Sequence, residues 1–192
     1  MPVRREDILD YVTYGERRDA LRHEAMAAKD LRRVHVGEHL TFLFENQATI
    51  RYQVQEMVRA ERLVRETDIR HELDTYNDLL GGPGAIGCTL LIEIDDPAER
   101  TRMLTLWRDL PRHLYVALDD GQGDGTRVRA SFDARQVGDE RLSAVQYLKF
   151  DTRGAVPVSV GSDHPSLRAE TKLTPEQRRA LEADLRAEEQ AR

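Results

Sequence analysis

Glu61 is the first residue whose position suggests chemistry, because it is a carboxylate on the apolar face of a predicted helix. Ile50, Val54 and Met57 recur at the spacing of one helical face, and Glu61 falls within about 20° of Ile50 at about 100° per residue. An unpaired carboxylate in a buried stripe is strongly unfavourable, so it needs a partner or a proton. A structural ion pair with Arg65 and a functional carboxylate both meet this need.

The same helix holds more polar side chains than a solvated face usually carries. A carboxylate whose pKa is raised by burial can act as a general base, and carboxylates with one histidine suit iron or manganese better than zinc. We therefore expect catalytic groups or metal ligands at Glu56, Glu61 and His164, in a cleft between this helix and a sheet. The expected ligand- or cofactor-binding residues are Glu45, Tyr52, Gln53, Arg59, Tyr76 and Asn77.

Less specific interpretations stand beside these. The polar residues of the helix are also typical of a solvated face. Asp163 could orient His164, but the following Pro165 favours a simple turn.

Three motif-like strings predict loops or strands more than they predict sites. Gly82 to Gly87 matches a dinucleotide-binding string, but a helix enters it and a strand leaves it, the reverse of the required order. Asp120 to Gly125 resembles a calcium loop and lacks the glutamate that would complete it. His35 and His39 are four residues apart on a predicted strand and turn, where that spacing does not favour a shared metal.

The helices and strands that must position these residues do not follow a regular β-α-β alternation. Helices are predicted over 14–30, after Asn46 and over 68–80, and the pattern of Ile86 to Ile94 predicts a strand. A helix is capped at Asp96, and a polar C-terminal helix begins after Thr174. Further strands are predicted at 34–38, 40–44, 114–118, 128–132, 144–150 and 156–160, with Pro157 placing the last at a sheet edge.

This order predicts an α+β fold, with N-terminal helices on one face of an antiparallel or mixed sheet and a C-terminal helical arm. We expect a single domain over residues 1–165 and a helical extension over 166–192. That extension is either loosely docked or a partner-binding arm, since Leu181 and Leu185 are its one clear apolar pair.

Composition narrows the function classes. The 192 residues are 40% apolar and 33% charged, with net charge -6, which argues against broad nucleic-acid affinity. Cys88 is the single cysteine, so a disulfide scaffold is excluded and a reducing compartment is indicated. No apolar run approaches a membrane helix, and the polar N-terminus does not resemble a signal peptide, so we expect a cytoplasmic protein.

The chain resembles the bacterial domain-of-unknown-function family 3501 over about residues 15 to 165. The motifs that carry the resemblance are Phe44-Glu45-Asn46, Tyr52-Gln53-Val54-Gln55-Glu56-Met57, Arg59, Glu61, Glu72, Tyr76-Asn77, Leu91-Ile92-Glu93-Ile94, Val145-Gln146-Tyr147-Leu148 and Asp163-His164-Pro165. The resemblance implies a setting beside rubrerythrin-like and iron-sulfur proteins, in redox or oxidative-stress metabolism. It implies no mechanism.

Two functions therefore compete. One is a metal-binding protein or small enzyme that uses the carboxylate-rich cleft. The other is a non-catalytic partner or assembly factor for a redox protein, docked through the C-terminal helix. The sequence leaves open whether the protein is an enzyme, and it gives no oligomeric state.

Overall fold

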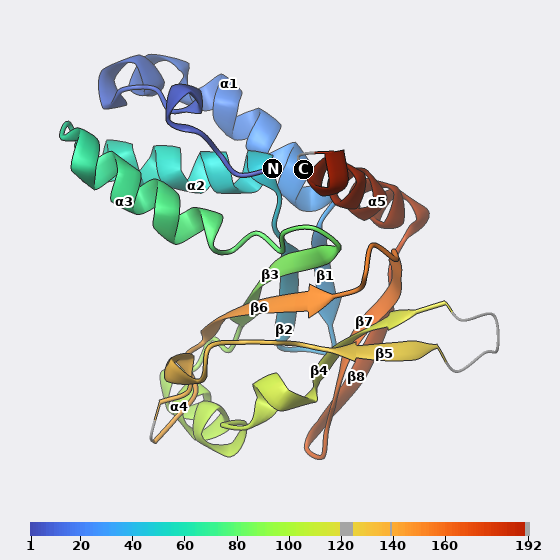
Figure 1. Ribbon diagram of the computed structural model, residues 1–192. Helices are drawn as coiled ribbons and strands as arrows, with labels where there is room; N and C mark the ends of the chain where they lie inside the picture. Colours follow the sequence, from blue (N-terminus) through green and yellow to red (C-terminus); the bar gives the residue numbers. More distant parts are fainter. Residues whose placement is uncertain (120–124, 139, 191–192) are drawn as a thin grey trace.

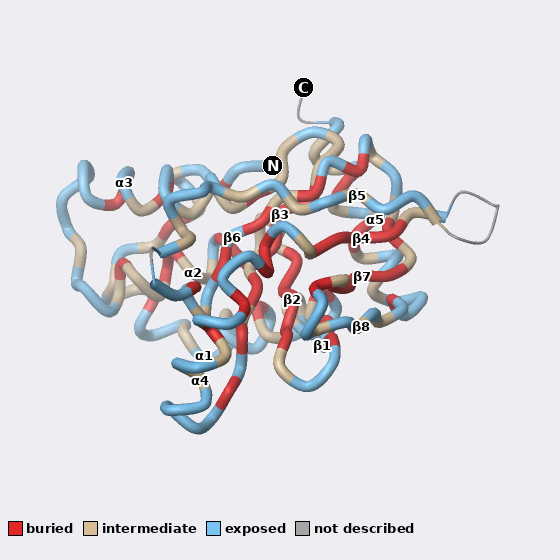
Figure 2. Tube along the Cα trace, turned by 90° about the horizontal axis from the view of Figure 1, so that it is seen from below, coloured by how far each residue is buried: buried red, intermediate tan, exposed pale blue. Residues whose placement is uncertain are grey.

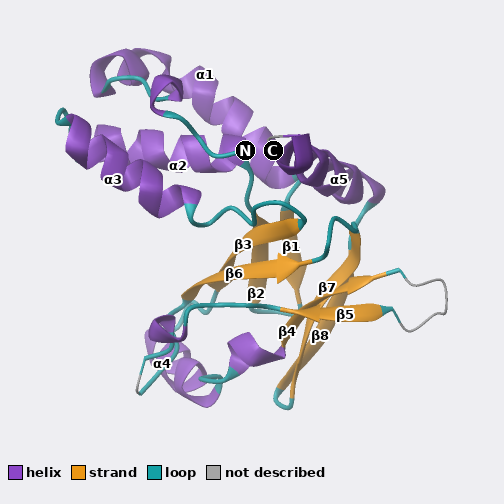
Figure 3. Cartoon of the chain, in the orientation of Figure 1, coloured by secondary structure: helices purple, strands orange, loops and turns teal. Residues whose placement is uncertain are grey.

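The N-terminal helices and the strands form separate layers in the computed structural model, which describes residues 1–119, 125–138 and 140–190 (Figure 1). Three helices lie together beyond one end of the strands, and the strands form two sheets that enclose most of the core (Figure 3). The helices are α1 (Tyr11–Asp30), α2 (Gln47–Ala60), α3 (Glu66–Asn77), α4 (Pro97–Leu106) and α5 (Pro175–Gln190). The expected α+β class is confirmed.

The helical layer consists of α1, α2 and α3 and has an apolar cluster of its own. The Asn46 side chain accepts a hydrogen bond from the Thr49 amide and caps α2, as its position predicted. Ile50, Val54 and Val58 then recur on one face of α2 and are buried. They pack with Ile69 and Leu73 of α3, so an amphipathic face on each of these two helices holds α2 and α3 together.

The strands form two antiparallel four-stranded sheets rather than one. Sheet A has the order β1-β2-β3-β6 and sheet B has the order β5-β4-β7-β8. Their bounds are β1 (Arg33–Val36), β2 (Leu40–Phe44), β3 (Ala85–Ile92), β4 (Leu114–Leu118), β5 (Thr126–Arg129), β6 (Val145–Asp151), β7 (Pro157–His164) and β8 (Leu167–Lys172). Buried residues line the strands between the sheets (Figure 2).

One face of sheet A is turned away from that core. Phe42 and Phe44 of β2 belong to the core cluster, so the alternation of strand side chains places Leu43 on the opposite face. Leu43 pairs with Thr89, and Thr89 pairs with Tyr147, which puts all three on this face. The outer face of sheet A is therefore available to the helical layer.

Two sequence expectations fail here for identifiable physical reasons. Helix α2 ends at Ala60, Arg62 then adopts a left-handed φ of 51°, and the C-cap Glu61 lies past Val58, the last buried residue of the helix, so it is exposed. The carboxylate is therefore not buried in the apolar stripe. Strand β7 lies between β4 and β8 rather than at a sheet edge, and Pro157 is tolerated because it is the first residue of the strand.

The chain beyond residue 165 contributes to the fold. Residues Leu167–Lys172 form β8, and Leu181 and Leu185 of α5 are buried in the core cluster. Arg32 donates two hydrogen bonds to Asp184, at 2.7 and 2.9 Å, and anchors α5 beside β1. Helix α5 is thus packed on the domain.

The glycine-rich string is a helix stop and a tight loop, as its reversed order predicted. A Cβ atom on Gly87 would lie 1.8 Å from the carbonyl oxygen of Leu79, so the loop and β3 require glycine there. The calcium-like string at 120–125 falls mostly outside the described residues.

Candidate functional site

A cleft of about 230 Å³ lies between the helical layer and the outer face of sheet A. Its walls combine apolar side chains with a small number of polar groups, which is the usual make-up of a ligand site. The lining residues come from α1, α2, α3 with the turn that follows it, and sheet A: Lys29, Leu43, Glu45, Thr49, Ile50, Gln53, Tyr76, Leu79, Thr89, Leu91, Val145 and Tyr147.

Lys29 is the cationic group of the cleft and stands near the end of α1. Its Nζ atom lies 5.0 Å from the centroid of the Tyr52 ring on α2, a cation–π contact. Within the described part of the chain, no carboxylate oxygen lies within 4.0 Å of Nζ. Burial lowers the pKa of Lys29, and the nearby carboxylate of Glu45 opposes this only in part.

Glu45 supplies the carboxylate of the cleft, in the connection between β2 and α2. The Thr49 hydroxyl donates a hydrogen bond of 2.5 Å to one carboxylate oxygen, and the Thr89 hydroxyl donates one of 2.7 Å to the other. These two hydroxyl groups fix the carboxylate at the junction of α2 and β3.

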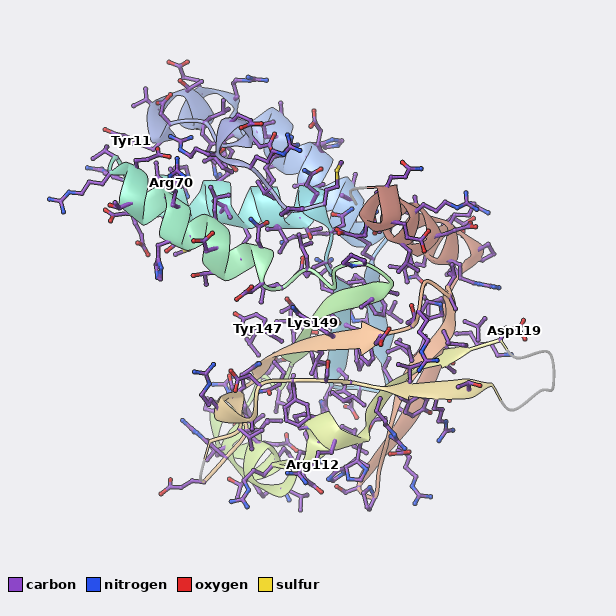
Figure 4. All side chains as sticks on the ribbon, viewed as in Figure 1. Tyr11, Arg70, Arg112, Asp119, Tyr147 and Lys149 are labelled. Carbon is purple, nitrogen blue, oxygen red and sulfur yellow. The ribbon has the colours of Figure 1, made fainter. Side chains whose placement is uncertain are left out.

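Two tyrosines border the cleft from opposite layers. Tyr76 comes from α3 and Tyr147 from β6, and Tyr147 is 41% exposed. Figure 4 shows Tyr147 and Lys149 on the side of β6 that faces the helical layer. Burial raises the pKa of Tyr147, and the charges of Tyr76 and Glu45 add to this effect.

Of the expected binding residues, Glu45, Gln53 and Tyr76 line this cleft, and Tyr52 contacts its lysine. Asn77 lies elsewhere: its side-chain amide exchanges two hydrogen bonds with the backbone of Val3 and ties the N-terminal segment to α3.

Glu56 occupies a different place, between α1 and α2. The Tyr14 hydroxyl donates a 2.6 Å hydrogen bond to it, Arg18 donates two at 2.8 and 3.0 Å, and Arg59 donates one at 3.2 Å. Burial alone would raise the pKa of this carboxyl group, but these donors outweigh burial and lower its pKa to about 2. Glu56 thus joins Arg18 of α1 and Arg59 of α2 in an ion-pair network between the two helices. Both carboxylate oxygens of Glu56 already accept hydrogen bonds.

His164 ends β7 in sheet B and is 5% exposed. Its Nε2 atom lies 3.0 Å from Asp109, and its Nδ1 atom accepts a hydrogen bond from the Ser166 amide. Because the amide needs an acceptor, the proton of the neutral ring resides on Nε2 and is donated to Asp109. The ring is fixed within a tight hairpin, next to the edge of His113.

The structure does not bring Glu56, Glu61 and His164 together. Glu56 is held by α1, Glu61 is exposed after α2, and His164 is held in sheet B. Among the residues that the structure describes, no group of three His, Cys, Asp or Glu side chains could hold a metal ion. The donor set expected for iron or manganese therefore does not fit such a site.

Lys29 and Tyr147 are cleft residues that the sequence reasoning did not select. A compositional signal for Lys29 was available, because the chain has 26 arginines and only three lysines, Lys29, Lys149 and Lys172. Tyr147 lies in an alternating strand pattern that predicts which residues share a face, but not what covers that face.

Comparison with known proteins agrees with the fold. The model of a family described as protein of unknown function (DUF3501) matches residues 2–185. A search of the curated proteins finds none that matches the chain. A novel protein of unknown function from Burkholderia pseudomallei, solved by crystallography, is 30% identical with a TM-score of 0.85, over 96% of this chain and 100% of that chain. Within the described ranges, no helix has the length and apolar character needed to span a membrane.

Proposed function

The chain belongs to the DUF3501 family, and from that premise we propose that it binds a compact organic ligand in the cleft between the helical layer and sheet A. The convergence of Lys29, Glu45, Gln53, Tyr76 and Tyr147 on one cleft carries the proposal. These residues come from separate elements, so the fold assembles the site.

The lining indicates the kind of ligand. Leu43, Leu91 and Val145 form an apolar floor on sheet A, which suits a hydrocarbon or aromatic body. Lys29 and Gln53 provide donors for the oxygen atoms of a carboxyl or carbonyl head group. The cleft thus favours a small molecule with an apolar body and an oxygen-bearing head.

The second function expected from the sequence, a partner for a redox protein, was linked to the C-terminal helix. Leu181 and Leu185 of that helix are buried in the core, so its apolar pair is already used. This geometry favours the cleft as the working site.

Binding is tested with two probes of one carbon skeleton, phenylpyruvate and phenyllactate, followed by amide chemical shifts. The expected result is saturable shifts at Leu91, Val145 and their neighbours with at least one probe. Val145→Trp fills the cleft from a position that is 38% exposed and should remove these shifts. Val12→Trp, at a 55% exposed position on α1, is the matched control and should leave them unchanged. Shifts that persist in Val145→Trp would contradict the proposed site.

A further inference from the structure

Lys29 differs from the other charged residues around the cleft in having a free amino group that faces a ligand-sized space. Glu45 is engaged by two threonine hydroxyls. Arg33, which follows α1 on β1, is paired with Asp30 at 3.4 Å. The Lys29 amine contacts the Tyr52 ring and, among the described residues, has no carboxylate within ion-pair distance.

We propose that Lys29 is a nucleophile that forms an imine with a small carbonyl compound bound in the cleft, such as a 2-oxo acid or an aldehyde. This inference rests on the proposed ligand cleft and names the substrate class. The supporting geometry is a half-buried lysine with an apolar floor beside it and a fixed carboxylate in the same cleft.

The environment of Lys29 favours its neutral form, which is the nucleophilic one. Burial among the groups of the cleft lowers its pKa, and the charge of Arg33 acts in the same direction. Glu45 acts against this shift. The Tyr52 ring on α2 attracts an ammonium ion more weakly than a carboxylate pair would, and Tyr76 and Tyr147 bring rings rather than carboxylates to the cleft.

The reaction balances without a further reactant. The nitrogen lone pair attacks the carbonyl carbon, the carbon–oxygen π bond breaks, and its electron pair takes a proton as nitrogen gives one up. The resulting hydroxyl then leaves as water with the second proton of the original amine, and the nitrogen lone pair forms the carbon–nitrogen double bond. Both amine protons thus end on the departing water, and Glu45, the carboxylate that lines the same cleft, is the group proposed to relay them from nitrogen to oxygen.

Reductive trapping tests this step. The full chain is incubated with phenylpyruvate and sodium cyanoborohydride, and the modified residue is located by mass spectrometry of peptides. The expected result is one adduct at Lys29 that saturates with probe and is suppressed by excess phenyllactate, which has no carbonyl to attack. The adduct should be lost in Lys29→Arg and retained in Lys149→Arg and Lys172→Arg.

A second measurement does not depend on any variant folding correctly. Competitive acetylation of the native protein across a pH series should show Lys29 becoming reactive at lower pH than it does in the denatured chain. Equal pH dependence in both states would overturn the inference, as would trapping shared among all three lysines.

The two proposals fail in different ways. If phenylpyruvate and phenyllactate both shift the cleft amides but no Lys29 adduct forms, the cleft binds ligands and the nucleophile is wrong. If neither probe shifts the cleft amides, the proposed site itself is wrong, and the inference falls with it.

Discussion

The hydroxyl group of Tyr14 on α1 donates a 2.6 Å hydrogen bond to the carboxylate of Glu56 on α2, where Arg18 also binds. Tyr14 is 1% exposed, so this bond joins the two helices inside their interface. Glu56 therefore acts as a structural anchor for the layer that forms one wall of the cleft.

Glu56 should make stability depend on pH under acidic conditions. Its pKa is lowered from 4.5 to about 2 in the folded protein, so its stabilising effect is present above pH 4.5 and is lost as the pH falls toward 2. Glu56→Gln should reduce the free energy of unfolding by about 2 kcal/mol at pH 7 and flatten this part of the pH profile. Urea unfolding at several pH values measures both effects. Glu16→Gln, at an exposed position of α1, should change neither; an unchanged acid slope in Glu56→Gln would refute the assignment.

Gly87 should tolerate no side chain, whereas Gly15 should accept one. A Cβ atom on Gly87 would overlap the Leu79 carbonyl oxygen, but one on Gly15 meets nothing within 4 Å. We expect Gly87→Ala to lower the free energy of unfolding by at least about 3 kcal/mol. Gly15→Ala, inside α1, should raise it by about 0.5 kcal/mol because alanine is the better helix former. Chemical denaturation compares the two, and a mild effect at Gly87 would show that the loop can move.

The C-terminal helix should behave as part of the folded domain. Leu185→Ala should lower the free energy of unfolding by about 2–4 kcal/mol, because Leu185 is 3% exposed in the core. Asp184→Asn should lower it by about 2 kcal/mol, because the Arg32 side chain is only 9% exposed and would lose its charge partner. Glu182→Gln on the same helix breaks only an exposed pair with Arg186 and should have an effect below about 0.5 kcal/mol. If all three variants unfold like the wild type, α5 is not docked in solution.

Cys88 should be inert in the native state. It is buried between β2 and β6 in sheet A, and burial raises the pKa of its thiol well above the usual value. Iodoacetamide should therefore label the protein in guanidinium chloride and leave the native protein unlabelled, as read from intact mass. Rapid native labelling would show that the core around Cys88 opens.

The sequence alone determined the features that depend on short-range physics. Asn46 caps α2 and Asp96 caps α4 because each accepts a hydrogen bond from an amide three residues ahead. Neighbouring residues also predicted the strand at Leu114–Leu118. They likewise predicted that a helix precedes Gly82 to Gly87 and a strand follows. The α+β class and the family resemblance follow from such local signals.

Only the tertiary structure decided which side chains meet. Helical spacing placed Glu61 in a buried stripe, but α2 ends at Ala60 and no longer buries its face at the C-cap Glu61, which is exposed. Glu56 looked like a site residue until α1 supplied Tyr14 and Arg18 as its partners.

The sequence predicted some of the cleft residues and missed others. Glu45, Gln53 and Tyr76 were expected to lie at a ligand site, but Lys29 and Tyr147 joined them only when α1 and β6 were placed against α2. Contacts between distant segments depend on how helices and sheets pack, and strand or helix periodicity fixes only which face a residue occupies. Packing therefore turned a set of polar residues into a defined cleft that contains the amine of Lys29.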